Sequence, residues 1–225
     1  MKVQENNWKT LSGKQKLVYF RDYYLVKALC ILAAIAMIGY LCFSILHKDQ
    51  TILYVACIDD VLDEQAVKEL EERLKEELGN EDKHALVMVD DSFYTSEDGI
   101  HKLEVYLSGR QVDLIVAAED TYKQLAAYGF MQDLNQVMDA KELEINKAKL
   151  MYTAGYKDSD EISFEDQETG KGDILPYGIK IKDSTQYKEV AGTLKNPVIG
   201  CTSNTKQNEN AKKILETMLN DSKTK

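Results

Sequence analysis

The hydrophobic pattern of the chain changes sharply near residue 46. Residues 28–46 read ALCILAAIAMIGYLCFSIL, nineteen residues without a charge. A helix rises about 1.5 Å per residue, so this run covers roughly 28 Å, enough to cross the apolar part of a membrane. After it, short apolar runs alternate with stretches whose apolar residues recur every three to four positions. The pattern therefore predicts a transmembrane helix over residues 25–46 and a separate domain over residues 51–225.

The second part of the chain is expected to consist of strands and helices in turn. The apolar runs that predict strands are residues 52–58, 85–89, 112–117, 174–181 and 197–202. Helical spacing is found from Leu62 to Leu78, at Ile100, Leu103 and Leu107, from Tyr122 to Ala126, from Leu134 to about Leu150, and from Ala211 to Leu219. Residues 155–173 are rich in Asp, Glu, Gly and Ser and predict an exposed loop or a short hairpin. Because strands that alternate with helices form βαβ units, we expect an α/β fold with a mainly parallel, doubly wound sheet.

Charge divides at the same place as hydrophobicity. Residues 1–46 hold six Lys and Arg against two Asp and Glu, a net charge of +4, while the remainder holds 22 against 36, a net charge of −14. The overall charge of −10 argues against a general nucleic-acid binder, which needs clustered Lys and Arg. Six basic residues precede the apolar run, so the positive-inside rule predicts that residues 1–24 are cytoplasmic and residues 51–225 extracellular.

Two alternatives to a lasting anchor are disfavoured. A cleaved signal peptide has an apolar core of about 7–15 residues and a small-x-small cleavage site, and this run is longer and lacks such a site. A lipoprotein cysteine at Cys42 is disfavoured by the bulky Leu41 before it. The segment is therefore expected to remain as a single membrane span.

Aromatic and basic residues mix just before the apolar run. The aromatic residues are Trp8, Tyr19, Phe20, Tyr23 and Tyr24, and the cations are Lys14, Lys16, Arg21 and Lys27. Such a segment predicts an interfacial collar, with rings at the headgroups and cations facing anionic lipid. A docking helix for a membrane or cytoplasmic partner is the alternative. The collar resembles those of small membrane proteins of low-GC Gram-positive bacteria.

Acidic pairs follow three of the predicted strands: Asp59 and Asp60, Asp90 and Asp91, and Glu119 and Asp120. Ligands of open α/β sheets bind outside the carboxyl ends of the strands. The acids are expected either to cap helices, which we favour, or to form a rim that holds a divalent cation or a basic peptide.

Aromatic residues also fall near the predicted strand ends. Tyr94, Tyr122 and Tyr177, with Phe93, either pack at the rim or form a stacking surface for a sugar or a side chain. Together with the six acids, the three tyrosines are our candidate ligand-binding or partner-binding residues.

The sequence holds no familiar catalytic motif. It lacks a Gly-x-Ser-x-Gly elbow, a phosphate loop and a His-Glu-x-x-His pair, and its three histidines have no metal-ligand spacing. A phosphoacceptor receiver domain is disfavoured because Ala118 stands where its phosphorylated aspartate would be. We therefore expect no catalytic residue, no metal and no cofactor. Cys57 and Cys201 lie on predicted strands and are either buried thiols or, outside the cell, a disulfide.

Three segments resemble extracellular solute-binding proteins of ABC transporters. Residues 112–134, VDLIVAAEDTYKQLAAYGFMQDL, are similar to a strand, short helix and Gly-aromatic-x-x-Asp-Leu turn of those proteins. ILPYG at 174–178 resembles their crossing strand, and residues 197–219, with NENA at 208–211, resemble a later strand and helix. The resemblance implies a periplasmic-binding-protein-like fold. The chain departs from the family between Leu150 and Ile174, where the intervening residues are too few for a second lobe.

A single lobe offers half a cleft, whereas small-molecule pockets enclose most of their ligand. We therefore expect a non-enzymatic, single-pass membrane protein whose outer lobe acts as a binding, sensory or interaction module for a protein partner. The alternative is a transport accessory or a tethered substrate-binding protein of an ABC transporter, which would bind a small solute if another lobe completed its cleft.

Overall fold

The computed structural model describes residues 12–46, 48–157 and 169–221, except the side chains of a few helical residues within these ranges. The chain divides between Lys48 and Asp49 into two compact units. Of the predicted collar, Trp8 lies outside the described residues, and nothing is described of the side chains of Tyr19, Phe20 and Tyr23. Residues 158–168 of the predicted loop also lie outside them.

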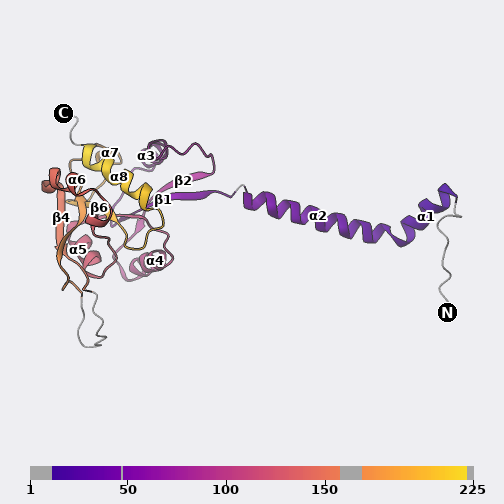
Figure 1. Ribbon diagram of the computed structural model, residues 1–225, viewed down its shortest axis with the longest axis horizontal. Coiled ribbons are helices and arrows are strands. Elements are labelled where there is room, and N and C mark those ends of the chain that lie inside the picture. Colours follow the sequence, from indigo (N-terminus) through magenta and orange to yellow (C-terminus); the bar gives the residue numbers. More distant parts are fainter. Residues whose placement is uncertain (1–11, 47, 158–168, 222–225) are drawn as a thin grey trace. The chain divides into compact units, whose positions relative to one another are not determined.

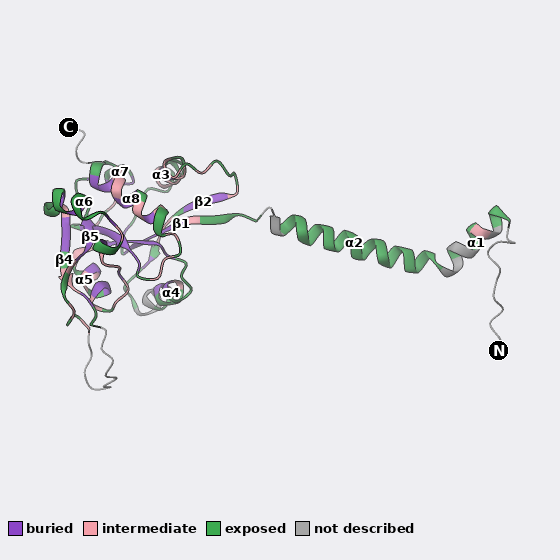
Figure 2. Cartoon of the chain, viewed as in Figure 1, coloured by how far each residue is buried: buried purple, intermediate pink, exposed green. Residues whose placement is uncertain are grey.

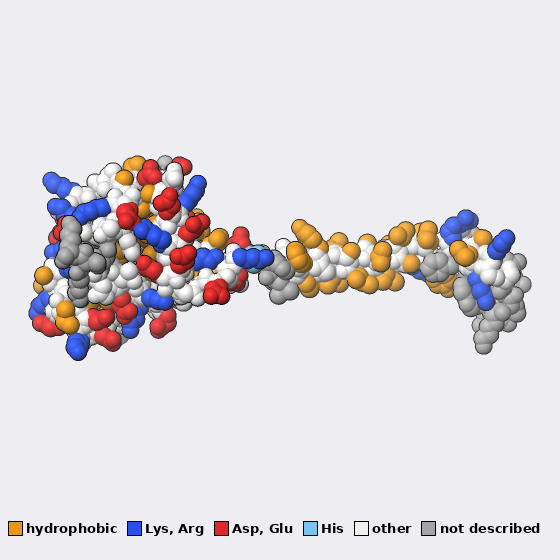
Figure 3. Space-filling model, turned by 90° about the horizontal axis from the view of Figure 1, so that it is seen from above, with side chains coloured by type: hydrophobic (Ala, Val, Ile, Leu, Met, Phe, Trp, Pro, Cys, Tyr) orange, Lys and Arg blue, Asp and Glu red, His pale blue; other side chains and the backbone are white. Residues whose placement is uncertain are grey.

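The first unit contains two helices, α1 (Gly13–Tyr23) and α2 (Leu25–Leu46). Residues 25–44 of α2 have a mean hydropathy of 2.3, and none of them is buried against other parts of the chain. Figure 3 shows hydrophobic side chains along α2, with Lys and Arg side chains beyond both its ends. The helix is thus long and apolar enough to span a membrane, as the sequence predicts.

The second unit is an α/β domain built on one six-stranded sheet (Figure 1). The strand order is β2-β1-β3-β6-β5-β4. The strands are β1 (Gln50–Ile58), β2 (Ala85–Phe93), β3 (Leu114–Ala118), β4 (Leu150–Ala154), β5 (Ile174–Lys180) and β6 (Pro197–Cys201). The helices are α3 (Glu64–Glu77), α4 (Glu97–Ser108), α5 (Glu119–Ala127), α6 (Ala140–Ile145), α7 (Thr185–Glu189) and α8 (Asn208–Asp221), with short 3-10 turns at Leu134–Gln136 and Lys147–Lys149.

The sheet is mixed, which corrects the expectation of a mainly parallel sheet. β1 pairs in parallel with β2 and β3, whereas β3 with β6, β6 with β5 and β5 with β4 are antiparallel pairs. The two parallel connections each contain a helix long enough to cross the sheet, α3 and α4. β4 begins where the sequence predicts the end of a helix. The segment predicted as a loop or hairpin connects β4 to β5, its antiparallel partner.

Helices cover both faces of the sheet, and Figure 2 shows the buried residues concentrated on the strands between them. On one face, α3 packs against alternate residues of the central strands through Leu70 and Leu74, and α8 does so through Ile214 and Leu215. On the other face Leu103 and Leu107 of α4 and residues of α5 pack against the remaining set. The alternation follows from the strand period of two, which sends neighbouring side chains to opposite faces.

Candidate functional site

The two acids after β1 hold the loops around them together. Asp59 adopts a left-handed backbone with φ of +52°. Its carboxylate accepts hydrogen bonds from the backbone N–H of Thr95 at 3.0 Å and from the Thr95 hydroxyl at 2.6 Å. Asp60 is completely buried. Its carboxylate accepts bonds from Tyr187 Oη at 2.7 Å, from the Val61 N–H at 2.9 Å, and from the N–H and hydroxyl of Thr193 at 2.7 and 2.9 Å. Both side chains thus connect neighbouring loops, the exposed Asp59 at the surface and Asp60 in the interior.

Asp91 and Glu119 each have a partner of their own, and Asp91 lies within β2 rather than after it. Asp91 accepts a hydrogen bond from the Leu62 N–H at 3.0 Å. Glu119 lies 2.7 Å from Lys123, and this hydrogen bond lowers the pKa of Glu119. Glu119 and the exposed Asp120 stand in the first turn of α5, where negative charge interacts favourably with the helix dipole. Among the described residues no group of three His, Cys, Asp or Glu is placed to hold a metal ion.

Two of the candidate tyrosines belong to the core. Tyr122 is completely buried, and its hydroxyl donates to the carbonyl oxygen of Tyr177 at 2.9 Å. Tyr177 is itself 8% exposed. Both rings are packed within the core on the α5 side of the sheet. Tyr94 is 48% exposed and remains available on the surface.

The two cysteines on strands are free thiols. β3 lies between their strands, and Cys57 stands opposite Val116 while Cys201 stands opposite Leu114. A disulfide would have to cross an intervening strand, which places the two Cα atoms beyond bridging distance. Burial raises the pKa of both thiols, that of Cys201 to about 12.

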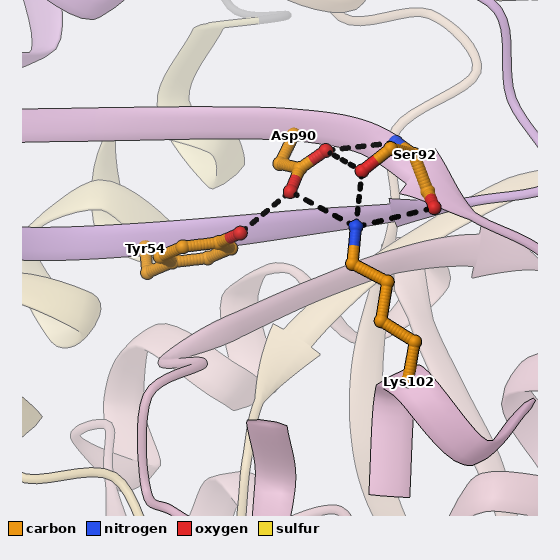
Figure 4. Close-up of polar contacts among 4 residues, drawn as sticks. All are labelled: Tyr54, Asp90, Ser92 and Lys102. Carbon is orange, nitrogen blue, oxygen red and sulfur yellow. Dashed lines mark hydrogen bonds and ion pairs between the residues drawn. The ribbon is translucent and has the colours of Figure 1, made fainter. Parts of the chain in front are cut away.

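Asp90 lies within β2 rather than after it as predicted, and it joins Tyr54, Ser92 and Lys102 in a network of polar side chains (Figure 4). Tyr54 Oη of β1 donates to its Oδ2 at 2.6 Å, and the Ser92 N–H donates to its Oδ1 at 2.8 Å. The Ser92 hydroxyl also donates to Oδ1, and Lys102 Nζ of α4 lies 3.6 Å from Oδ2. Lys102 donates in addition to the Ser92 hydroxyl and, at 3.3 Å, to the Ser92 carbonyl oxygen.

The surroundings of this network set its charges. Burial opposes ionisation of Asp90, but the bonds from Ser92 and Tyr54 and the charge of Lys102 outweigh it, so the pKa of Asp90 is lowered. Burial is the main cause that raises the pKa of Tyr54, and the hydrogen bond to Asp90 raises it further. Lys102 Nζ lies 4.1 Å from the centre of the Phe93 ring, an additional cation–π contact.

The contact between Ser92 and Lys102 does not form a nucleophile and its base. A lysine that activates serine must accept the hydroxyl proton. Here the Ser92 hydroxyl donates to Asp90 and Lys102 is the donor to Ser92. The network therefore ties α4 to β1 and β2.

A cavity of about 490 Å³ opens beside this network, toward the amino ends of β1 and β3. We call it the tyrosine cleft. Tyr54, Asp90 and Met88 line one side, and Tyr106 and Arg110 line another at the end of α4. Its remaining lining residues are Thr51, Gln111, Asp113, Lys206 and Gln207.

Hydrogen bonds fix the base of the tyrosine cleft. Asp113 is 4% exposed and accepts bonds from the Tyr54 N–H, at 2.9 Å, and from the Thr205 hydroxyl. Burial raises the pKa of Asp113 against the effect of these bonds. The carboxylate links β1, β3 and the segment before α8, so the residues around it are held in fixed relative positions.

The net charge inside the tyrosine cleft differs from that of the domain. Lys102 offsets the charge of Asp90. Within the described ranges neither Arg110 nor Lys206 has an ion-pair partner, although residues 47–225 carry a net charge of −14. The cleft thus combines two cations that form no ion pair with the partly exposed ring of Tyr106, above the buried carboxylate of Asp113 and the nearly buried ring of Tyr54.

Sequence reasoning places only Asp90 at this cleft. Tyr106 and Arg110 come from the end of α4, and Lys206 comes from the segment before α8. The rule that ligands bind at the carboxyl ends of strands does not point to these positions.

Comparison of the chain with models of protein families and with curated proteins finds no match. The resemblance to solute-binding proteins therefore stays a prediction from short motifs.

Proposed function

We propose that this protein is a non-enzymatic, membrane-anchored binding module. In this proposal α2 crosses the membrane once, the N-terminus is cytoplasmic, and the α/β domain lies outside the cell as a single solute-binding-like lobe. The apolar, unburied surface of α2 and the excess of basic residues before it support the anchoring and its direction.

The tyrosine cleft is the observation that carries the binding role. Arginine pairs with carboxylates through two parallel N–H groups, and tyrosine rings stack on flat apolar groups. A cleft with Arg110, Lys206 and the partly exposed ring of Tyr106 on its walls fits a carboxylate that is attached to a flat or apolar group. Such a group occurs at the surface of a protein partner and on small organic acids.

The ABC-transporter alternative has weaker support. A transport-type binding protein encloses its solute between two lobes, whereas the described part of the outer domain contains one sheet. The tyrosine cleft is open on one side in this chain alone. A second lobe from another protein would be required, and we therefore favour the interaction module.

Titration of the full chain, in detergent, with benzoate and N-acetyltyrosine tests this proposal. A ligand that binds only the folded state raises the melting temperature. We expect at least one probe to raise it in the wild type and to have no effect on the variant R110Q/K206Q.

The variant K83Q/K141Q removes two exposed cations elsewhere and is the matched control, which should respond like the wild type. The proposal is overturned if neither probe shifts the wild type, or if R110Q/K206Q responds as strongly as the wild type does.

A further inference from the structure

A second cavity of about 490 Å³ lies where β5 ends and β6 begins. Three lysines line it, Lys149, Lys180 and Lys182, and we call it the lysine hollow. The apolar part of its wall is formed by Ala148, Ile181, Pro197 and Met218, and the polar remainder by Glu119, Asp183, Ser184 and Asn196. Its volume falls within the range of ligand pockets, about 300–1,000 Å³.

The two carboxylates of the lysine hollow are already paired with cations outside it. Glu119 lies 2.7 Å from Lys123 and Asp183 lies 3.6 Å from Lys188. Neither Lys123 nor Lys188 lines the hollow. The hollow is lined by three lysines and two acids, so its lining keeps a formal excess of one positive charge, although the charge of Lys180 also acts on Glu119.

The lysines of the hollow differ in their availability. Lys149 donates a hydrogen bond to the carbonyl oxygen of Leu219 near the end of α8. Lys180 and Lys182 flank the buried Ile181 and are exposed. Across the described ranges of the chain, neither of these two has an ion-pair partner within 4 Å. Two exposed lysines without an ion-pair partner thus line one cavity, in a domain with a large excess of acids.

We propose that the lysine hollow binds a phosphate group. A lysine ammonium is a compact point charge with three donors, which suits a tetrahedral oxyanion, whereas arginine is favoured for planar carboxylates. Lys180 and Lys182 match the two negative charges of a phosphate monoester, and the Asn196 amide adds a donor at the wall. The apolar part of the wall accommodates the carbon atoms next to the phosphate.

Calorimetric titration of the full chain in phosphatidylcholine nanodiscs with inorganic phosphate and with glycerol phosphate tests this site. Ionic strength is held constant with sodium chloride, because screening alone changes the binding of anions to a charged protein. We expect saturable binding to the wild type and at least about a tenfold loss of affinity in K180Q/K182Q, since each charge-assisted hydrogen bond contributes on that order. The control K83Q/K141Q removes the same charge elsewhere and should bind like the wild type. Absence of binding to the wild type, or equal affinity in K180Q/K182Q, overturns the proposal.

The same titration separates two sources of the phosphate. If a lipid headgroup occupies the hollow, nanodiscs that contain phosphatidylglycerol will weaken the binding of added phosphate to the wild type. An unchanged affinity assigns the site to a free phosphate compound. The inference does not rest on the tyrosine cleft: R110Q/K206Q should bind phosphate like the wild type, so failure at one site is distinguishable from failure at the other.

Discussion

Asp90 contributes stability that depends on pH. Its folded-state pKa is lowered, so this stability is fully present above the unfolded pKa of about 3.9 and is lost as pH falls through the lower folded value. Ser92→Ala removes one donor to the carboxylate. We expect the variant to be less stable than the wild type by about 1 kcal/mol at pH 7, and the difference to shrink below about pH 4 as Asp90 is protonated.

Denaturant unfolding of both proteins between pH 3 and pH 7 measures this difference. Ser203→Ala is the control, because Ser203 is exposed and distant from Asp90 in sequence, and its effect should not change with pH. A difference between wild type and Ser92→Ala that stays constant over the whole range would show that the hydroxyl does not act through the charge of Asp90.

At the scale of single residues, the sequence identifies polar positions better than it identifies their partners. The acidic pairs can be identified as candidate functional residues from their positions near the ends of apolar runs. Their partners cannot, because Asp60 bonds to Tyr187 and Thr193, more than a hundred residues later. The roles of Tyr122 and Tyr177 are equally hard to predict from sequence. A tyrosine near a strand end can lie at the rim of a site, or in a core where its hydroxyl has a hydrogen-bond acceptor.

At the scale of elements, two glycines let Tyr122 of α5 lie against β5 and β6. A Cβ on Gly200 would come within 2.0 Å of the Tyr122 hydroxyl and 2.6 Å of the Tyr177 carbonyl oxygen. A Cβ on Gly178 would come within 2.5 Å of a Val198 methyl group and 3.0 Å of the Tyr122 ring. The contact between the helix and the sheet therefore depends on the absence of side chains at these positions.

Gly200→Ala should destabilise the α/β domain by about 3 kcal/mol or more, because backbone and a buried ring must move to admit one methyl group. Tyr122→Phe in the same chain removes the nearest clashing atom and should recover part of the loss. Denaturant unfolding of the single and double variants measures both effects. Gly39→Ala in α2, where a Cβ meets nothing within 4 Å, should leave the unfolding of the domain unchanged. A Gly200→Ala protein as stable as the wild type would refute the close approach.

The sequence pattern predicts the existence of most elements but not the direction of every strand. β1, β3 and β6 fall on apolar runs because they are covered on both faces, whereas the edge strand β2 begins on such a run and continues into polar residues. β4 was missed because its five residues follow a helical stretch without a break such as Gly or Pro. The direction of a strand depends on the path by which the preceding connection crosses the sheet. Hydrophobic periodicity carries no information about that path.

At the scale of the whole molecule, hydrophobicity and charge divide the chain at the same point. An apolar helix follows a basic segment, and an acidic domain follows the helix after a few residues. The proposed orientation, with the larger part of the chain translocated, follows from this arrangement through the positive-inside rule. The cysteines provide a way to test it, because Cys57 and Cys201 are buried in the domain while Cys30 and Cys42 lie in α2.

Glu76→Cys, on the exposed side of α3, should react with a membrane-impermeant maleimide on intact cells. Lys14→Cys, on α1, should react only after the membrane is permeabilised. The wild type should stay unlabelled in both conditions, since two thiols are shielded by the core and two by lipid. Labelling is read from the mass of the purified protein. The opposite pattern, with Lys14→Cys labelled on intact cells and Glu76→Cys protected, would reverse the orientation. It would place both the tyrosine cleft and the lysine hollow in the cytoplasm, where their ligands would have to be sought among cytoplasmic anions.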